Sequence, residues 1–198
     1  MSSVQRPEPI SVKDYLAGEV ASGTKHEYVG GVVYAMAGAS NAHNLLASNA
    51  LGSLHALLRG SDCRAYNSDT KIRVRMAAQV RFYYPDASVI CRPNPLTDSF
   101  QDEPAIIVEV TSHATRRIDE GEKRDAYLTI PSLVAYVLVD QSSPTIVVHR
   151  RTEQGFVPES YSGLDAIIHL PELQITISLA EIYDGFNFSQ QLGKSEAE

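Results

Sequence analysis

The sequence predicts an α/β fold in which a mixed sheet packs against at least two helices, with added β-hairpins. One observation is a long amphipathic helix over 40–60, where leucine and alanine recur at helical spacing. A second is a pair of continuous apolar runs, 86–91 and 105–111, which are typical of central strands covered on both faces. A third is a series of shorter apolar segments bounded by turn residues, typical of outer strands.

The N-terminal elements are predicted to be a short helix and a hairpin. Ser11 can cap the helix, and Gly18 can end it. The Gly30–Gly31 pair separates two strand-like segments and supplies the positive φ angles of a tight turn.

The long helix can begin at Ser40, as its cap, and close at Gly60. Short strands are predicted after it at 63–66, 71–74 and 80–83. In the second of these, Lys71, Arg73 and Arg75 alternate with apolar residues, so we expect one face of this strand to be wet and cationic.

Another helix is predicted over 115–128, with Thr115 or Ser112 as its cap. Asp119 and Lys123 are spaced i,i+4 with the acid first, which is the favourable order. Few apolar residues lie in its first turns, so we expect these turns to be exposed or to line a cleft. Strands at 133–139, 145–150, 155–161 and 166–168 and a last helical turn at 178–182 complete the fold.

At 198 residues the chain is expected to form one domain over 11–188, with an extended lead-in over 1–10 and a polar tail over 189–198. No apolar run is long enough to cross a membrane and no secretory signal is present, so we expect a cytoplasmic location. Cys63 and Cys91 have no metal-binding or redox spacing, and two reduced thiols are favoured over a disulfide.

The net charge of −7 restricts how the chain could bind nucleic acid. Proteins that bind the phosphates of nucleic acid usually have a basic face, so in this acidic chain any such face must be local. Two groups of residues are candidates, although a solvated surface is the commoner role of such groups: Lys71, Arg73, Arg75 and Arg81, and Arg116, Arg117, Lys123 and Arg124.

The residues with the clearest chemical signal are Asp86 and Glu109. Glu109 lies inside an aliphatic run, where a carboxylate is costly unless it is paired or binds a metal. If the two strands pair, both carboxylates lie close together, and either one takes up a proton or a cation lies between them. Oxygen ligands without nearby histidine or thiolate favour Mg²⁺ or Mn²⁺, and such a site suits phosphate chemistry.

Each candidate also has a purely structural interpretation. Asp86 alone is better explained as a turn residue, and His43 as a structural or surface histidine rather than a catalytic or phosphate-contacting one. Asp69 and Lys71 could line the same cleft, but a surface ion pair is favoured. Thr111 is better explained by water binding or helix capping than by catalysis.

The order of these landmarks resembles the Uma-two family of endonuclease-like proteins, which belongs to the PD-(D/E)XK nuclease superfamily and has a restriction-endonuclease-like fold. The resemblance covers roughly Val12 to Ile182. It rests on Pro85-Asp86, on Glu109-Val110-Thr111-Ser112, on Glu122-Lys123-Arg124 with Tyr127, and on the strand that ends at Asp140.

The resemblance implies that Asp86 and Glu109 bind the metal together with a backbone carbonyl near Val110. The third motif position would ordinarily be lysine, but here it is Thr111, which nominates Lys123 on the following helix. Glu27 resembles the additional acid of many such nucleases, and a solvated strand residue is an equally good interpretation of it.

The leading hypothesis from the sequence is a Mg²⁺-dependent or Mn²⁺-dependent endonuclease acting on DNA, in which Lys123 orients water and stabilises transition-state charge. One alternative is a nuclease-like binding or assembly module with weak or no catalysis. Another is a phosphohydrolase of small nucleotides, which would tolerate an acidic surface better. Cutting both strands of a duplex favours a two-fold pair of sites, so a homodimer is compatible with the leading hypothesis.

Overall fold

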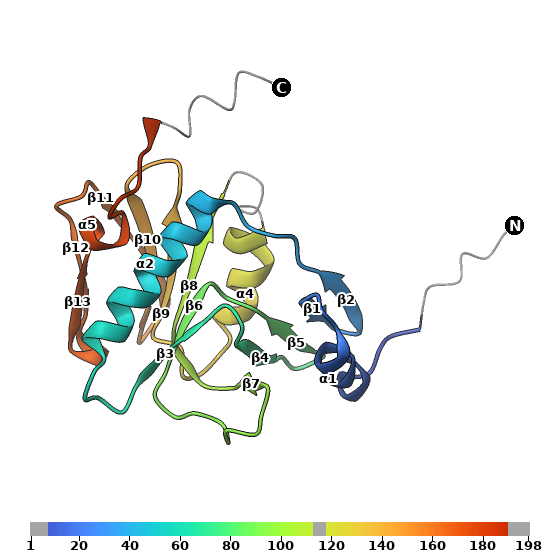
Figure 1. Ribbon diagram of the computed structural model, residues 1–198. Coiled ribbons are helices and arrows are strands. Elements are labelled where there is room, and N and C mark those ends of the chain that lie inside the picture. Colours follow the sequence, from blue (N-terminus) through green and yellow to red (C-terminus); the bar gives the residue numbers. More distant parts are fainter. Residues whose placement is uncertain (1–7, 113–117, 190–198) are drawn as a thin grey trace, which may run out of the picture.

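The computed structural model describes residues 8–112 and 118–189. Within these ranges the strands form three sheets, and helices cover both faces of the largest one (Figure 1). The predicted α/β class with a mixed sheet is therefore confirmed. None of the described helices combines the length and the hydropathy that crossing a bilayer requires.

The largest sheet holds the two strands that the sequence marks as central. Its spatial order is β11 (Gly155–Ser162), β10 (Thr145–Thr152), β9 (Ala135–Asp140), β8 (Pro104–Thr111), β6 (Ala87–Ile90) and β3 (Arg64–Asn67). Strand β8 pairs antiparallel with β6 and parallel with β9, which makes the sheet mixed. All eight residues of β8 are buried, as expected for a strand covered on both faces.

A second sheet packs beside the first and carries the N-terminal hairpin. Its order is β2 (Val32–Ala35), β1 (His26–Val29), β5 (Val80–Tyr83), β4 (Lys71–Arg75) and β7 (Phe100–Gln101). Gly30 and Gly31 have φ angles of 56° and 102°, so the predicted glycine turn is confirmed. The third sheet pairs β12 (Ile167–Leu170) with β13 (Ile175–Ser178).

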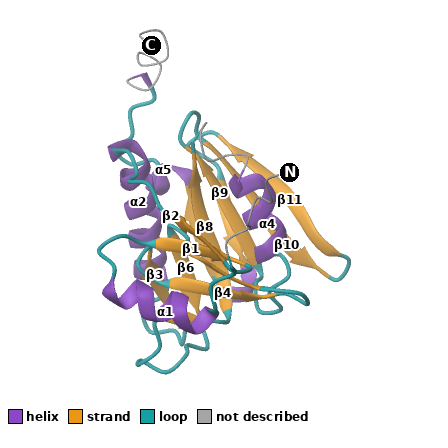
Figure 2. Cartoon of the chain, turned by 90° about the vertical axis from the view of Figure 1, so that its right-hand side faces the viewer, coloured by secondary structure: helices purple, strands orange, loops and turns teal. Residues whose placement is uncertain are grey.

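The described helices are α1 (Val12–Ala21), α2 (Asn41–Leu57), α4 (Arg124–Tyr127) and α5 (Leu179–Ile182), with a π-helical turn η1 (Asp119–Lys123) and a 3-10 turn η2 (Pro171–Leu173). Helices α2 and α4 lie on opposite faces of the largest sheet, whereas α1 packs against the second sheet (Figure 2). Because side chains alternate along a strand, Val108 and Val110 join the core under α2, whereas Ile107 joins the core under α4. Glu109 therefore belongs to the α4 face.

The expected ends of two helices need correction. Helix α1 does not end at Gly18 but continues to Ala21, because Glu19 is anchored by the Tyr84 hydroxyl and by the backbone amide of His26. In the helix predicted over 115–128, the described part begins as the π-helical turn η1. Asp119 and Lys123 are buried there rather than exposed. The predicted cap Thr115 lies outside the described residues.

The prediction of a wet, cationic face on β4 is wrong. Lys71 is buried and donates to the Tyr84 hydroxyl at 3.1 Å, because β4 lies inside the second sheet between β5 and β7. Arg73 is paired through two hydrogen bonds with Asp102. Two strands are not expected from the sequence, the two-residue β7, which only its pairing with β4 defines, and β13, although Ile175 to Ser178 alternate between apolar and polar residues.

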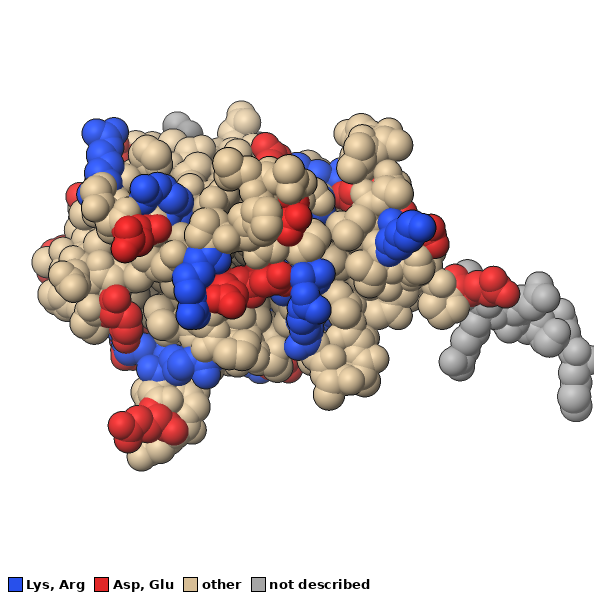
Figure 3. Space-filling model, turned by 90° about the horizontal axis from the view of Figure 1, so that it is seen from below, with Lys and Arg blue, Asp and Glu red and all other residues tan. Residues whose placement is uncertain are grey.

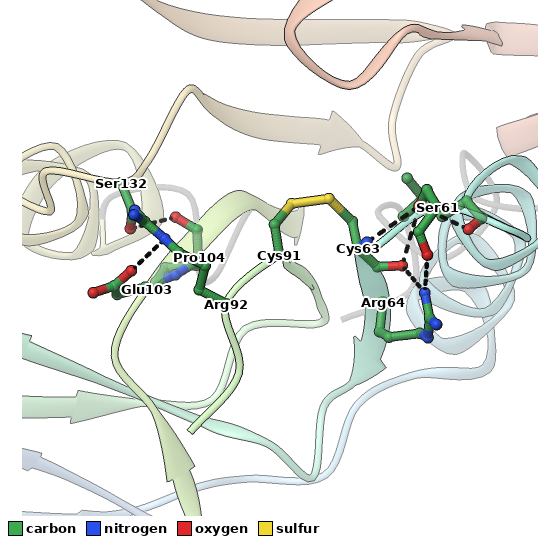
Figure 4. Close-up of a disulfide and its surroundings, with 9 residues drawn as sticks. Ser61, Cys63, Arg64, Cys91, Arg92, Glu103, Pro104 and Ser132 are labelled. Carbon is green, nitrogen blue, oxygen red and sulfur yellow. Dashed lines mark hydrogen bonds and ion pairs between the residues drawn. A yellow bond between two sulfur atoms is a disulfide. The ribbon is translucent and has the colours of Figure 1, made fainter. Parts of the chain in front are cut away.

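The two cysteines are also not reduced thiols, because Cys63 and Cys91 form a disulfide (Figure 4). In the pairing of β3 with β6, Arg64 faces Ile90, so the next pair outward brings Cys63 opposite Cys91. The pairing register, which sequence spacing does not reveal, creates this bond.

Candidate active site

Asp86 and Glu109 lie at the same end of two paired strands. In the ladder between β6 and β8, Ala87 faces Val108, so Asp86 and Glu109 are the next residues in order. The backbone amide of Val110 donates to Asp86 Oδ2 at 2.7 Å, which fixes the Asp86 side chain against the end of β8. The two carboxylates therefore converge, as the strand assignment led us to expect.

Lys123 reaches the cluster of Asp86 and Glu109 from the turn η1, which follows β8 in the chain. Its Nζ lies 2.8 Å from Glu27 Oε1, 3.4 Å from Glu109 Oε1 and 3.8 Å from Asp119 Oδ1. Only 10% of the Lys123 side chain is exposed. The lysine that follows the acid pair in sequence is thus a buried cation among carboxylates.

Glu27 comes from β1 in the second sheet, which brings the N-terminal hairpin into the site. Besides its contact with Lys123, Glu27 Oε1 accepts a long hydrogen bond of 3.5 Å from the backbone amide of Tyr84, just before Pro85 and Asp86. The Tyr84 side chain is held in turn by Glu19 and Lys71. The segment that leads into Asp86 is therefore anchored to the second sheet and to α1.

His43 reaches the site from the first turn of α2. Ser40 Oγ accepts a hydrogen bond from the backbone amide of His43 at 3.2 Å, which caps the helix at this point. The imidazole Nε2 lies 3.2 Å from Asp86 Oδ2. His43 therefore contacts one member of the acid pair, Asp86, and its role stays a prediction.

Glu109 is held by two donors on one oxygen. Its Oε1 accepts from the Tyr127 hydroxyl at 3.3 Å and from Lys123 Nζ at 3.4 Å. Burial raises the pKa of Glu109 well above its usual value, and the charges of Asp86, Asp119 and Glu27 raise it further, against the opposing effect of Lys123. The site therefore resists accumulating negative charge on Glu109.

The same carboxylates act on Lys123 in the opposite sense. Burial alone would lower the pKa of Lys123, but the charges of Glu109, Glu27 and Asp119 outweigh it and raise the pKa above its usual value. Lys123 is therefore charged at neutral pH. This one ammonium group faces three carboxyl groups, those of Glu27, Glu109 and Asp119.

The charged surface outside this cluster is mixed in sign. On the described part of the face in Figure 3, Lys and Arg side chains lie next to Asp and Glu side chains rather than in a broad basic patch. Two ion pairs of this mixed surface join Arg73 to Asp102 and Arg92 to Glu103. Most cations proposed for a local basic face are thus already paired, and Arg116 and Arg117 lie outside the described residues.

Comparison with known proteins identifies the family. A family model described as Uma2, "Putative restriction endonuclease", matches residues 12–180. The chain belongs to the Uma2 family. The resemblance drawn from the order of the sequence landmarks is thereby confirmed.

Relatives of this Uma2 protein occur in Synechocystis sp. (strain ATCC 27184 / PCC 6803 / Kazusa). The uncharacterized protein slr1290 is 31% identical over 181 residues, which is 90% of this chain and 94% of the relative. The uncharacterized protein sll1609 is 31% identical over 144 residues, which is 71% of this chain and 80% of the relative.

A solved structure shares the fold of this Uma2 protein. It is the crystal structure of a protein from Anabaena variabilis ATCC 29413 that is described as "a putative nuclease belonging to DUF820". The two agree with a TM-score of 0.68 and 16% identity, over 91% of this chain and 98% of the other. This likeness concerns the fold, and the predicted restriction-endonuclease-like architecture is confirmed.

Two of the residues considered from the sequence have other contacts than expected in this Uma2 protein. Asp69 is 70% exposed and forms a surface ion pair, but its partner is Lys25 at 2.6 Å and not Lys71, which is buried. Thr111 is buried, and its hydroxyl donates a weak bond of 3.4 Å to the Val139 carbonyl rather than capping a helix.

Two members of the cluster were not nominated as site residues from the sequence. Asp119 was recognised only as a helical partner of Lys123, and its burial beside the acids was not apparent. Tyr127 was noted in the family pattern, but its hydroxyl bond to Glu109 depends on the packing of α4 against β8. In the sequence, the signal for both residues is the regular spacing of Asp119, Lys123 and Tyr127, each four residues after the last, which places them on one side of a helix.

Proposed function

We propose that this Uma2 protein is an endonuclease that hydrolyses phosphodiester bonds of DNA with Mg²⁺ or Mn²⁺. The observation that carries the proposal is the convergence of Asp86, Glu109 and Lys123, in which a buried ammonium group lies among buried carboxylates. The family description supports the choice of reaction and of DNA as the substrate.

The donor set suits a hard divalent cation. Carboxylate oxygens are the preferred ligands of Mg²⁺ and Mn²⁺, and the cluster has more acids than the one lysine neutralises. Among the described residues, no group of three or more His, Cys, Asp or Glu side chains forms a ligand set. Mg²⁺ often uses only one or two carboxylates and keeps several waters, so Asp86, Glu109 and the Val110 carbonyl would be sufficient.

Each residue then has a distinct role. When bound, the cation would neutralise charge on the phosphoryl group and lower the pKa of a water molecule. Lys123 contributes a fixed positive charge beside the reacting phosphate and orients the attacking water. Glu27 accepts from the Lys123 ammonium and holds it in place. Because Lys123 is buried and preorganised, its charge acts without reorganisation of solvent.

Plasmid nicking in the presence of Mg²⁺ or Mn²⁺ tests the proposal. Asp86→Asn removes the charge of a ligand while retaining its shape, and a loss of about 100-fold or more is expected from the several kcal/mol that metal catalysis supplies. Asp69→Asn is the matched control, because Asp69 is an exposed aspartate outside the cluster. If wild type and Asp86→Asn nick plasmid equally, the assignment is wrong.

A second candidate is a phosphohydrolase of small nucleotides, which the net charge of −7 and the paired surface cations favour. Long DNA needs phosphate contacts beyond the reacting group, whereas a free nucleotide does not. Parallel assays with supercoiled plasmid and with free nucleotides separate the two candidates. Hydrolysis of nucleotides without any nicking would favour the second.

A further inference from the structure

We infer that His43 is a positioning residue that holds Asp86 from the α2 side, so that Asp86 presents only Oδ1 to a bound cation. The inference rests on the proposed function, since it assigns Asp86 as a ligand. It goes further by giving a role to a histidine that belongs to neither strand of the acid pair.

The first step of the argument is that both polar contacts of the Asp86 carboxylate fall on the same oxygen. Within the described part of the chain, Oδ2 is contacted by the Val110 amide at 2.7 Å and by His43 Nε2 at 3.2 Å. One hydrogen bond and one close ion-pair contact on the same oxygen restrict the rotation of the carboxylate. The other oxygen, Oδ1, is then left for a ligand.

The second step is that the two contacting groups belong to rigid and separate elements. The Val110 amide lies on the buried central strand β8. His43 lies on α2, whose first turn is capped by Ser40 and whose Leu46 and Ala50 pack into the core. Neither donor can follow the carboxylate if it rotates, so together they define its orientation. Second contacts of this kind orient metal ligands in many proteins.

The third step concerns the other nitrogen of the ring. His43 Nδ1 is buried and has no hydrogen-bond partner among the described residues, although only 16% of the side chain is exposed. A buried polar atom without a partner costs stability. An apolar side chain would avoid this cost, so the contact of Nε2 with Asp86 is the feature that accounts for an imidazole at this position.

The fourth step is a parallel arrangement at Glu109. Its Oε1 accepts from Tyr127 and Lys123, just as Asp86 Oδ2 is contacted by Val110 and His43. In both carboxylates one oxygen is engaged twice within the protein. His43 therefore does for Asp86, from the α2 face, what Tyr127 does for Glu109 from the α4 face.

The experiment compares His43→Gln and His43→Asn with His55→Leu and His43→Leu. The Gln amide can reach Oδ2 as Nε2 does, the shorter Asn amide cannot, and His55 is an exposed histidine on the last turn of the same helix. Calorimetric titration with Mn²⁺ and hydrogen exchange of the Val110 amide are the two measurements. The second of these requires neither metal nor substrate.

We expect His43→Leu and His43→Asn to weaken Mn²⁺ binding by about 10–100-fold and to speed exchange of the Val110 amide. His43→Gln should stay within about 3-fold of wild type, because it keeps the donor, and His55→Leu should not differ from wild type. If His43→Leu does not fold, the comparison of His43→Gln with His43→Asn still shows whether residue 43 holds the Asp86 carboxylate.

Two other outcomes are distinguishable. If wild type binds Mn²⁺, Asp86→Asn does not, and both His43→Leu and His43→Asn bind like wild type with unchanged Val110 exchange, the positioning role is refuted and the proposed function stands. If wild type does not bind Mn²⁺ at all, the proposed function fails. Val110 exchange then still reports whether His43 holds the Asp86 carboxylate.

Discussion

Glu27 Oε1 lies 2.8 Å from Lys123 Nζ, and this contact joins the first hairpin to the turn that follows β8. The two residues are far apart in sequence: Glu27 lies on strand β1 of the second sheet, and Lys123 lies on the π-helical turn η1. Through this pair the second sheet contributes directly to the cluster around Asp86 and Glu109, instead of only supporting it.

We predict that Glu27→Gln reduces nicking by about 10–100-fold while leaving the fold intact. The substitution keeps the shape of the side chain but removes the charge that holds Lys123, so the ammonium group is placed less accurately. Initial nicking rates at saturating Mg²⁺ provide the measurement. Glu103→Gln, which disrupts only a surface pair with Arg92, is the control and should have no effect.

Lys123→Met should destabilise the protein strongly. Removal of a buried cation leaves carboxylates without compensation, which typically costs about 3–5 kcal/mol. Lys25→Met removes an ion pair with the exposed Asp69 and should cost no more than about 1 kcal/mol. Urea denaturation of both variants gives the free energies of unfolding, and equal losses would contradict the buried role of Lys123.

Divalent metal should stabilise the folded protein by mass action. At a Mn²⁺ concentration 100 times Kd, the free energy of unfolding should increase by about 2.7 kcal/mol. Asp86→Asn should abolish this increase, and EDTA should reverse it in the wild type. A rise in Tm that is the same in both proteins would point to binding elsewhere.

The pair of Arg73 with Asp102 should make stability depend on pH. Burial alone would raise the pKa of Asp102, but hydrogen bonds from Arg73 and Asn94 and the charges of Arg73 and Arg75 hold that pKa below its usual value. The stabilisation is therefore fully present above the unfolded pKa of about 3.9 and is lost as the pH falls through the lower folded pKa.

Asp102→Asn tests this dependence. The difference in unfolding free energy between wild type and Asp102→Asn should be constant near neutral pH and should shrink as the solution is acidified below about pH 4. Urea denaturation over this range provides the measurement. A difference that grows on acidification would show that the carboxylate is not stabilised in its ionised form.

Reduction of the Cys63–Cys91 disulfide should lower stability without abolishing activity at 25 °C. The bond closes a loop with a sequence separation of 28, for which chain entropy predicts about 3–4 kcal/mol. Neither cysteine contacts the acid cluster in the described structure. Denaturation with and without dithiothreitol measures the effect, and Cys63→Ser should be insensitive to the reductant.

The sequence locates the main parts of the cluster because their signals are local. Glu109 is conspicuous as an acid within an aliphatic strand, and the order of two apolar runs already places Asp86 beside it. The convergence of Glu27 and His43 on these acids depends on how the hairpin and α2 pack, which no short window of sequence specifies.

The features that were predicted incorrectly also depend on tertiary contacts. Gly18 has a low helix propensity, yet tertiary contacts of Glu19 carry α1 past it. Lys71 alternates like a surface residue but is buried because β7 and β5 flank its strand. The disulfide arises from strand register, to which the spacing of two cysteines gives no guide.

Strand β8 presents Glu109 to one layer of the protein and Val110 to the other. A slip of this strand by a single residue would exchange the two layers, so that the acid would enter the aliphatic packing beneath α2 and valine would replace it next to Lys123. Folding and chemistry thus share one alignment of the chain, and an inserted residue within 104–111 cannot damage either without damaging both.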